Sequence, residues 1–251
     1  MNPSLAASYE QMRDYSSAVQ TLRRGDNEHF FGGGMTNGYF SHRDTVVPIR
    51  LNTRGWNDGA TPNPAPFYMS TAGYGVLRNT MTPGSYDFHA PMALSHDEPR
   101  FDAFYFVGAQ AANPLKHILD DYTQLTGRPF MMPRWGLGFG DADCYNKTGK
   151  TIDVIERVAK QYRAHDMPGQ WILPNDGYGC GYTDLPGTIT HLRSLGFLGG
   201  LWTENGLERI ATEVRDMGSR AMKLDVAWVG RGYQFALNGM RDAYEGLEKN
   251  A

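Results

Sequence analysis

The stretch KLDVAWVG at Lys223–Gly230 places a carboxylate, Asp225, inside an apolar run that begins at Ala221. Four to eight apolar, β-branched or aromatic residues are typical of a buried strand. Lys223 lies two positions before Asp225, so both side chains point to the same face of that strand. A neighbouring cation favours the ionised carboxylate, which suits a nucleophile better than a proton donor. A buried structural ion pair is the alternative.

Three further apolar segments that resemble strands precede this stretch. Each of the four predicted strands is followed by apolar residues at helical spacing. The predicted strands are WGLGF (Trp135–Phe139), GQWILP (Gly169–Pro174), FLGGLW (Phe197–Trp202) and AMKLDVAW (Ala221–Trp228). Repeated strand–helix units indicate parallel strands with right-handed crossovers. Four such units are half of a (β/α)₈ barrel. The sequence therefore predicts an α/β domain at 128–251, the first half of a TIM barrel.

The chain before this region has a different character. Short alternating or aromatic segments are separated by Gly, Pro and Asn-Asp clusters, which is typical of an all-β region. The segments are TVVPIRL (Thr45–Leu51), PFYMST (Pro66–Thr71), GYGVLRNT (Gly73–Thr80) and FDAFYFVG (Phe101–Gly108). A connector helix is expected between Pro114 and Gly127, while the first 25 residues show mixed helical character. Residues 1–127 are thus expected to form an all-β region followed by this helix.

Composition narrows the classes of function. The 251 residues carry a net charge of -3, which does not resemble a basic nucleic-acid surface. No apolar run approaches the roughly 20 residues of a membrane span, and the first residues lack the pattern of a signal peptide. Aromatic residues make up 12% of the chain, which suits stacking on a neutral, hydroxyl-rich ligand as well as a packed core.

The two cysteines, Cys144 and Cys180, each follow a predicted strand. Two cysteines are too few for a disulfide framework, and their spacing is not that of a zinc site. A disulfide between them is possible, but sequence spacing alone does not give the required geometry. The cysteines therefore do not indicate whether the protein belongs to an oxidising or a reducing compartment.

Polar and aromatic residues gather at the C-terminal ends of the predicted strands. The C-terminal ends of parallel strands lie together at one end of a barrel, where the active sites of barrel enzymes lie. Carboxylates that bind hydroxyls, together with aromatic rings that stack on a sugar, predict a carbohydrate site; a set of helix N-caps is the alternative. The polar residues are Asp141, Asp143, Asn175, Asp176, Glu204, Asn205 and Asp225, and the aromatic ones are Tyr145, Tyr178, Tyr182, Trp202 and Trp228.

Two other kinds of site have weaker support. Asp141, Asp143 and Asp176 offer oxygen ligands to a hard cation, but no histidine lies at these strand ends. The run GYGCG at Gly177–Gly181 follows a strand, yet it lacks the glycine spacing of a dinucleotide site. No metal and no cofactor is predicted.

Several ordered motifs resemble glycoside hydrolase family 31. FFGGGMTNGYFSHR (Phe30–Arg43) and PFYMSTAGYGVLRNT (Pro66–Thr80) are similar to the N-terminal β-sandwich of that family. RPFMMPRWGLGFGDADCYN (Arg128–Asn146) is similar to its entry into the barrel, and KLDVAW to the segment that carries the nucleophile. The resemblance implies that Asp225 is the nucleophile of a retaining glycosidase.

Three segments most resemble an α-N-acetylgalactosaminidase-like branch of the family in sequence: WILPNDGYGCGY, LWTENG and KLDVAWVG. The resemblance implies that Lys223 and Asp176 bind the O3, O4 or O6 hydroxyl of a galactose-type sugar, while Asn175 stands where the related α-galactosidases have an acid. The expected substrate-binding residues are Asp143, Asn175, Asp176, Tyr178, Trp202, Glu204, Lys223 and Trp228.

The family resemblance also implies what lies outside this chain. A retaining enzyme needs a second carboxyl group as acid/base, and in this family it follows the sixth strand. The chain is therefore expected to be a piece of a longer enzyme and inactive alone, with self-association through the open half-barrel as a possibility. The expected partner is a carbohydrate, and the family implies a bacterial enzyme exported to glycan-rich surroundings.

Competing hypotheses remain open at this point. The enzyme is expected to act on terminal α-linked N-acetylgalactosamine, with an α-galactosidase or α-glucosidase as alternatives. A non-catalytic carbohydrate-binding protein would bind sugar at the same strand ends, and its Asp225→Asn variant would keep the affinity for sugar. A structural fragment would use Asp225 and Lys223 only as an ion pair and would bind no sugar.

Overall fold

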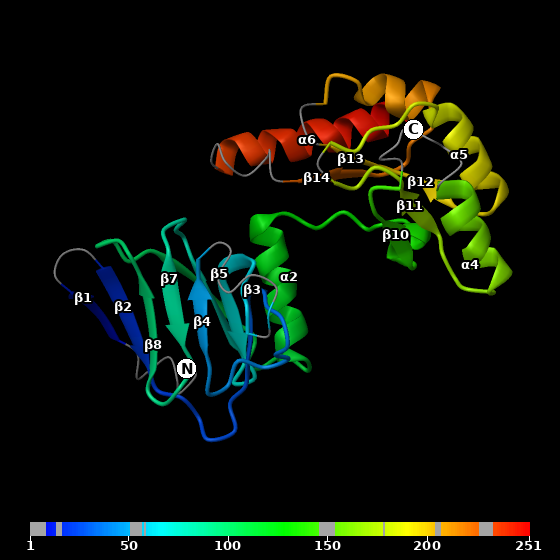
Figure 1. The fold of residues 1–251 in the computed structure, drawn as a ribbon. Helices are drawn as coiled ribbons and strands as arrows, with labels where there is room; N and C mark the ends of the chain where they lie inside the picture. The colour runs from blue at the N-terminus through cyan, green and yellow to red at the C-terminus, as the bar shows by residue number, and fades with distance from the viewer. Residues whose placement is uncertain are drawn as a thin grey trace. The chain divides into compact units, whose positions relative to one another are not determined.

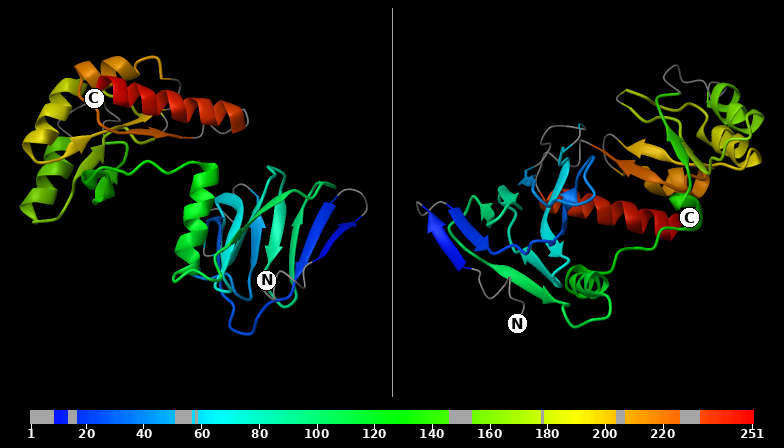
Figure 2. Two further views of the ribbon diagram at one scale, coloured as in Figure 1. Left: turned by 180° about the vertical axis from the view of Figure 1, so that it is seen from behind. Right: turned by 90° about the horizontal axis from the view of Figure 1, so that it is seen from below.

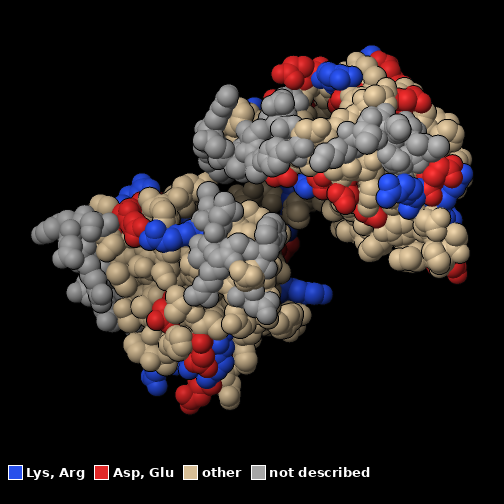
Figure 3. Space-filling view, viewed as in Figure 1, with Lys and Arg blue, Asp and Glu red and all other residues tan. Residues whose placement is uncertain are grey.

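The computed structural model describes residues 9–13, 17–50, 57, 59–145, 154–177, 179–203, 207–225 and 233–251. The chain divides into two compact units, Met1–Pro129 and Phe130–Ala251 (Figure 1). Basic and acidic side chains are interspersed in small groups over the described surface of the face in Figure 3. No described helix has both the length and the apolar composition needed to cross a membrane.

The first unit consists of two antiparallel sheets around a shared core. The sheets have the strand orders β1-β2-β8-β7-β4 and β3-β5-β6-β9. Aromatic residues from both sheets meet in this core: Phe30 of one sheet stacks on Phe88, and Tyr68 contacts Tyr86 edge to face. The strands are β1 (Tyr9–Arg13), β2 (Ser17–Leu22), β3 (Phe30–Met35), β4 (Val46–Ile49), β5 (Asn63–Ser70), β6 (Tyr74–Arg78), β7 (Gly84–Asp87), β8 (Met92–His96) and β9 (Ala103–Val107).

One expectation for this unit is wrong. The described part of the first 25 residues forms strands β1 and β2 rather than helix. Strand β2 pairs with β8 from Ala18 opposite His96 to Leu22 opposite Met92. Because the paired residues are 70 to 78 positions apart in the sequence, local residue spacing gave no indication of this pairing.

The connector helix α2 (Pro114–Thr126) is confirmed and covers the outer face of the four-stranded sheet, as the two views of Figure 2 show. Asn113 caps its N-terminus by accepting a hydrogen bond from the Lys116 N–H at 3.2 Å. Ile118 is fully buried on this sheet, and the Tyr122 ring stacks on Phe67 at a centroid distance of 4.0 Å.

The second unit contains short parallel strands. The pairings β10-β11-β12 and β13-β14 are all parallel. Gly200 separates β12 from β13, so this segment passes from one partner to the next: Gly200 N–H donates to Ile172 O, and Leu201 N–H donates to Ala221 O, both at 2.9 Å. The strands are β10 (Gly140–Ala142), β11 (Trp171–Leu173), β12 (Leu198–Gly199), β13 (Leu201–Thr203) and β14 (Met222–Leu224).

The first predicted strand of this unit is wrong in its position. Residues Arg134–Leu137 form a 3₁₀ helix, and the strand begins only at Gly140. The residues WGLGF alternate as they would in a strand. The segment nevertheless turns, with a hydrogen bond from Gly136 N–H to Pro133 O. Pairing with the sheet starts where Phe139 O accepts from Gln170 N–H at 2.8 Å.

Helical segments follow the strands. A π-helical stretch (Ile155–Ala159) runs into α4 (Lys160–Ala164), and α5 (Leu185–Ser194) follows β11. A second π-helical stretch (Thr212–Asp216) follows β13, and α6 (Tyr233–Asn250) ends the chain. These segments match the predicted strand–helix alternation in the described residues.

Strand β11 separates the helix side of this sheet from its other side. Ile172 is fully buried against helical residues that include Ile155 and Leu192. Its neighbours Trp171 and Leu173 therefore point to the opposite face. A Cβ at Gly140 would overlap the Trp171 ring, so this ring covers the glycine of β10.

Candidate active site

An ammonium between two carboxylates forms the centre of the candidate site. Lys223 Nζ lies 2.8 and 3.1 Å from the two carboxylate oxygens of Asp176, and 3.6 Å from Asp225 Oδ2. Lys223 is 46% exposed, Asp176 17% and Asp225 38%. The cluster is thus open to a solute, unlike a fully buried structural ion pair.

Two short parallel sheets, β10-β11-β12 and β13-β14, bring these three residues together. Lys223 lies on β14, and Asp225 follows the last residue of that strand, while Asp176 follows β11. Because the strands are parallel, their C-terminal ends lie at one edge. The predicted meeting of Asp176, Lys223 and Asp225 is present in the structure.

The charges of this cluster act on Lys223. Burial by itself lowers the pKa of the Lys223 ammonium, but the hydrogen bonds and charges of Asp176 and Asp225 outweigh it. The pKa of Lys223 therefore lies above its ordinary value. The side chain is a cation at neutral pH and donates hydrogen bonds without accepting them.

Trp202 gives Asp225 a second donor. The indole Nε1–H donates to Asp225 Oδ2 at 3.0 Å, so Trp202 and Lys223 both contact the same carboxylate oxygen. Trp202 is 4% exposed and lies on β13, directly opposite Lys223 in the β13–β14 register. Its ring is an orienting group for the carboxylate rather than an open stacking platform.

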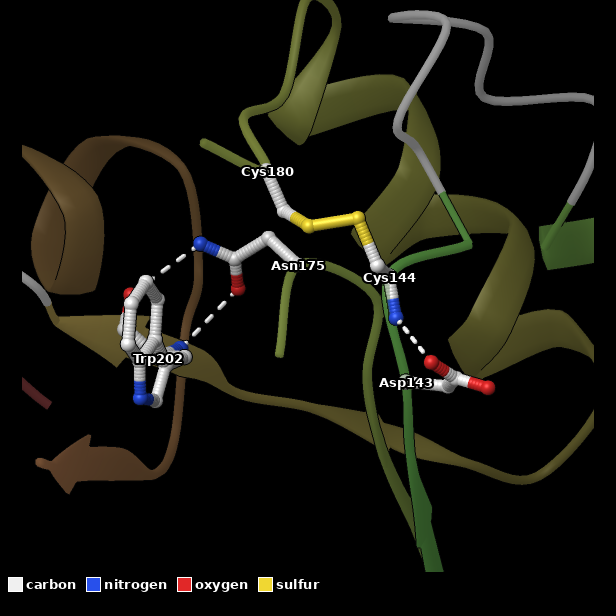
Figure 4. The surroundings of a disulfide bond; sticks show 5 residues. All are labelled: Asp143, Cys144, Asn175, Cys180 and Trp202. Atoms are coloured by element: carbon white, nitrogen blue, oxygen red, sulfur yellow. Dashed lines mark hydrogen bonds between the residues drawn. A yellow bond between two sulfur atoms is a disulfide. The ribbon is translucent and has the colours of Figure 1, made fainter. Parts of the chain in front are cut away.

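Asn175 contacts the backbone of the same tryptophan. Its side-chain carbonyl accepts from Trp202 N–H at 2.9 Å, and its amide nitrogen donates to Trp202 O at 3.0 Å (Figure 4). Asn175 is 5% exposed. A direct contact between Asn175 and sugar stays a prediction, while the structure adds this contact with Trp202.

A disulfide joins the loops that follow β10 and β11. Cys144 and Cys180 are paired, with their Cα atoms 5.7 Å apart (Figure 4), which answers the question that spacing left open. Next to it, Asp143 Oδ1 accepts from Cys144 N–H at 2.7 Å, and Asp176 N–H donates to Asp143 O at 3.2 Å. Asp143 thus lies in the loop that supports Asp176, and its contact with sugar stays a prediction.

Asp141 has a different environment from Asp143. The hydroxyl groups of Tyr145 and Tyr162 each donate to one of its carboxylate oxygens at 2.6 Å. The bond to Asp141 is the largest cause that raises the pKa of Tyr162, to about 12. Burial first, and then Asp141, raise the pKa of Tyr145. Asp141 therefore anchors the loop after β10 to a helix.

A cavity of about 410 Å³ lies beside the candidate cluster within the second unit. Asp176 and Lys223 contribute to its wall together with Trp135 and Trp171. Neither tryptophan was among the residues predicted for the site. Trp171 shares its strand face with Leu173, and this alternation was the available signal.

Four residues predicted at the site lie outside the described residues: Tyr178, Glu204, Asn205 and Trp228. Their roles remain predictions. Within the described part of the chain, no three His, Cys, Asp or Glu side chains form a group suited to a metal ion.

Comparison with known proteins places this geometry in context. Residues 6–87 match the family model described as the glycosyl hydrolase 31 N-terminal galactose mutarotase-like domain. Alpha-glucosidase 2 of Bacillus thermoamyloliquefaciens is 24% identical over 171 residues, which are 62% of this chain and 20% of that protein. Alpha-xylosidase 1 of Arabidopsis thaliana is 33% identical over 86 residues, 34% of this chain and 8% of that protein. The chain thus spans a fifth or less of these relatives.

Solved structures share the fold. The Flavobacterium johnsoniae GH31 dextranase FjDex31A, complexed with glucose, matches 82% of this chain and 27% of its own with a TM-score of 0.59 and 22% identity. The cycloalternan-forming enzyme from Listeria monocytogenes matches 91% and 23%, with a TM-score of 0.59 and 16% identity. The family model and the relatives support the resemblance to glycoside hydrolase family 31. None of these names is that of an α-N-acetylgalactosaminidase.

Proposed function

We propose that this chain carries the nucleophile and part of the sugar site of a retaining α-glycosidase. The observation that carries the proposal is the environment of Asp225. Its carboxylate stands at the C-terminal end of a parallel strand, with the Lys223 ammonium at 3.6 Å and the Trp202 indole N–H at 3.0 Å from one oxygen. Both donors favour the ionised form that attacks an electrophilic carbon.

The proposed chemistry follows from an ionised carboxylate next to a bound sugar. Asp225 attacks the anomeric carbon, an ester bond forms to the sugar, and the bond to the leaving oxygen breaks. A second carboxyl group protonates that oxygen, and water then hydrolyses the ester so that the anomeric configuration is retained. The family resemblance assigns that second group to a later strand than β14.

The Lys223–Asp176 pair supports a sugar as the ligand of this site. An ammonium donates to a hydroxyl oxygen, and a carboxylate accepts from a hydroxyl hydrogen, so the pair suits two neighbouring hydroxyls of one ring. The sequence similarity of the segments around Asp176 and Asp225 favours terminal α-linked N-acetylgalactosamine as the specific sugar. Carbohydrate is the only partner that this proposal needs, and no cofactor takes part.

A second candidate is an α-glucoside or α-xyloside as substrate. The names of the relatives, Alpha-glucosidase 2 and Alpha-xylosidase 1, favour it. Glucose and galactose differ only in the orientation of one hydroxyl, so the same pair of charged groups could bind either sugar. A panel of sugars decides between the candidates.

The test is covalent trapping with activated 5-fluoro-α-glycosyl fluorides of the N-acetylgalactosamine, galactose and glucose types. Fluoride leaves without a general acid, so the probe reports the nucleophile by itself. We expect intact mass to rise by one glycosyl group and peptide mapping to place it on Asp225. Asp225→Asn should not be labelled, whereas Asp216→Asn, which removes an exposed carboxylate paired with Arg215, should be labelled normally. A folded chain that no probe labels, or labels elsewhere, would reject the proposal.

A further inference from the structure

We infer that Asn175 is a positioning residue that fixes the orientation of the Asp225 carboxylate through Trp202. This inference rests on the proposed nucleophile role of Asp225. It is based on a continuous chain of hydrogen bonds. The Asn175 side chain is hydrogen-bonded to the Trp202 backbone, and the Trp202 indole N–H donates to Asp225.

The first link is an amide that takes the place of a neighbouring strand. Strand β11 pairs with the segment at Leu198–Gly199, but its last residue is Leu173, before the level of Trp202. The Asn175 amide carries one acceptor and one donor, as a peptide unit does, and bonds both backbone groups of Trp202. The side chain therefore continues the sheet for one further pair of hydrogen bonds.

The second link depends on the position of the Trp202 backbone. On its other side this residue pairs with Lys223 of β14, so the backbone of Trp202 is held from both neighbours. The ring is almost fully buried, and its N–H reaches Asp225 at 3.0 Å. A shift of the β13 backbone moves the ring and, with it, the donor on the carboxylate.

This arrangement gives a reason for an asparagine at position 175. An aspartate at this position could accept from Trp202 N–H, but it would place a negative oxygen against Trp202 O. Only the amide supplies both the acceptor for Trp202 N–H and the donor for Trp202 O, whereas an ionised aspartate would leave that buried carbonyl without a donor.

The first experiment follows the indole of Trp202 in the whole chain by NMR with ¹⁵N-labelled tryptophan. The chain has five tryptophans, and Trp202→Phe identifies the signal of Trp202. Asp225→Asn defines the shift that a changed carboxylate contact causes. We expect Asn175→Leu, which has a similar volume, to move the same signal. Thr188→Val removes a buried hydroxyl that donates to Asp184 O in the same unit and should leave the signal in place.

The second experiment measures covalent trapping by the glycosyl fluoride that labels the wild-type chain best. We expect Asn175→Leu to lower the maximal rate of labelling about tenfold to a hundredfold, as a misplaced reacting group does. The probe concentration at half-maximal rate should change by less than about twofold, because the sugar contacts stay. Thr188→Val should label at the wild-type rate, and Asn175→Ser replaces Asn175→Leu if the latter does not fold.

The outcomes separate this inference from the proposed function. An unchanged Trp202 signal and labelling rate in folded Asn175→Leu would overturn the positioning role, as would equal losses in Thr188→Val. A wild-type chain that no probe labels rejects the proposed function, while the NMR result still decides whether Asn175 controls the Trp202–Asp225 contact.

Discussion

The carboxylate of Asp176 holds the Lys223 ammonium with both of its oxygens, at 2.8 and 3.1 Å, across 47 residues of sequence. A half-exposed ion pair of this kind contributes little to folding, about 0–1 kcal/mol. Its geometry is therefore better explained by the site at the end of β11 and β14 than by stability.

Replacing the ammonium tests this explanation. Lys223→Met keeps the length of the side chain and removes its charge and donors. We expect the affinity for the preferred monosaccharide, measured by titration calorimetry, to fall about tenfold or more, because hydrogen bonds to charged groups contribute about 1.5–3 kcal/mol. Lys160→Met is the matched control, since Lys160 is similarly exposed and paired with Glu156. Equal losses in both variants would contradict a sugar-binding role.

The disulfide is expected to stabilise the second unit. Cys144 and Cys180 are 36 residues apart, and closing a loop of this length stabilises the folded state by about 3–4 kcal/mol in the chain-entropy description. The double variant Cys144→Ser with Cys180→Ser should lose about this much in urea unfolding. Reductant should destabilise the wild-type chain and leave the double variant unchanged. Identical unfolding of the wild-type chain with and without reductant would refute this expectation.

The tyrosine pair on Asp141 is expected to stabilise the loop after β10. Tyr162→Phe removes one hydrogen bond of 2.6 Å to the carboxylate and should lower the free energy of unfolding by about 1.5–3 kcal/mol. Tyr244→Phe removes the same kind of bond, to Glu248, on an exposed surface and should cost less than about 0.5 kcal/mol. If the two variants were equally stable, Asp141 would not be an anchor.

A buried histidine gives the first unit a pH dependence. His96 is fully buried, with Nδ1 against Thr82 O and Nε2 against the Tyr86 hydroxyl. Burial lowers the pKa of His96 below its ordinary value, against the hydrogen bond to Thr82, which raises it. The unfolded chain, in which the pKa is about 6.5, therefore binds the proton more readily. The contribution to stability is complete above that pH and is lost as the pH falls through it.

Comparing two histidine variants measures this effect. Unfolding of the wild-type chain by urea should become easier between pH 7.5 and 5.0, by up to about 1.4 kcal/mol per pH unit for each such histidine. His96→Asn should show a smaller difference between the two pH values. His117→Asn, which alters an exposed side chain on α2, should keep the wild-type difference. A pH dependence that is the same in all three proteins would exclude His96 as its source.

The sequence predicted the parallel strand–helix part well because each strand there is a short apolar run followed by helical spacing. Trp171–Leu173 and Met222–Leu224 lie within their predicted segments. The first strand was misplaced because WGLGF alternates like a strand, whereas a turn after Pro133 decides its conformation. Strand β2 was missed because its partner β8 is remote in sequence.

The candidate site was predictable where it depends on strand ends. Asp176, Lys223 and Asp225 were selected because polar residues after parallel strands share one edge, and the structure brings them together. The roles of Asn175 and Trp202 could not be inferred in this way. A hydrogen bond from a side chain to a backbone depends on the local path of two strands, and residue type does not reveal it.

The Trp171 ring occupies the space that a side chain at position 140 would need. We therefore expect the two positions to vary together: a larger residue at 140 needs a smaller one at 171. Gly140→Ala alone should be lost from any library selected for folding, and it should return together with Trp171→Leu. A pair of substitutions that is permitted only in combination marks a contact that related sequences can reveal without a structure.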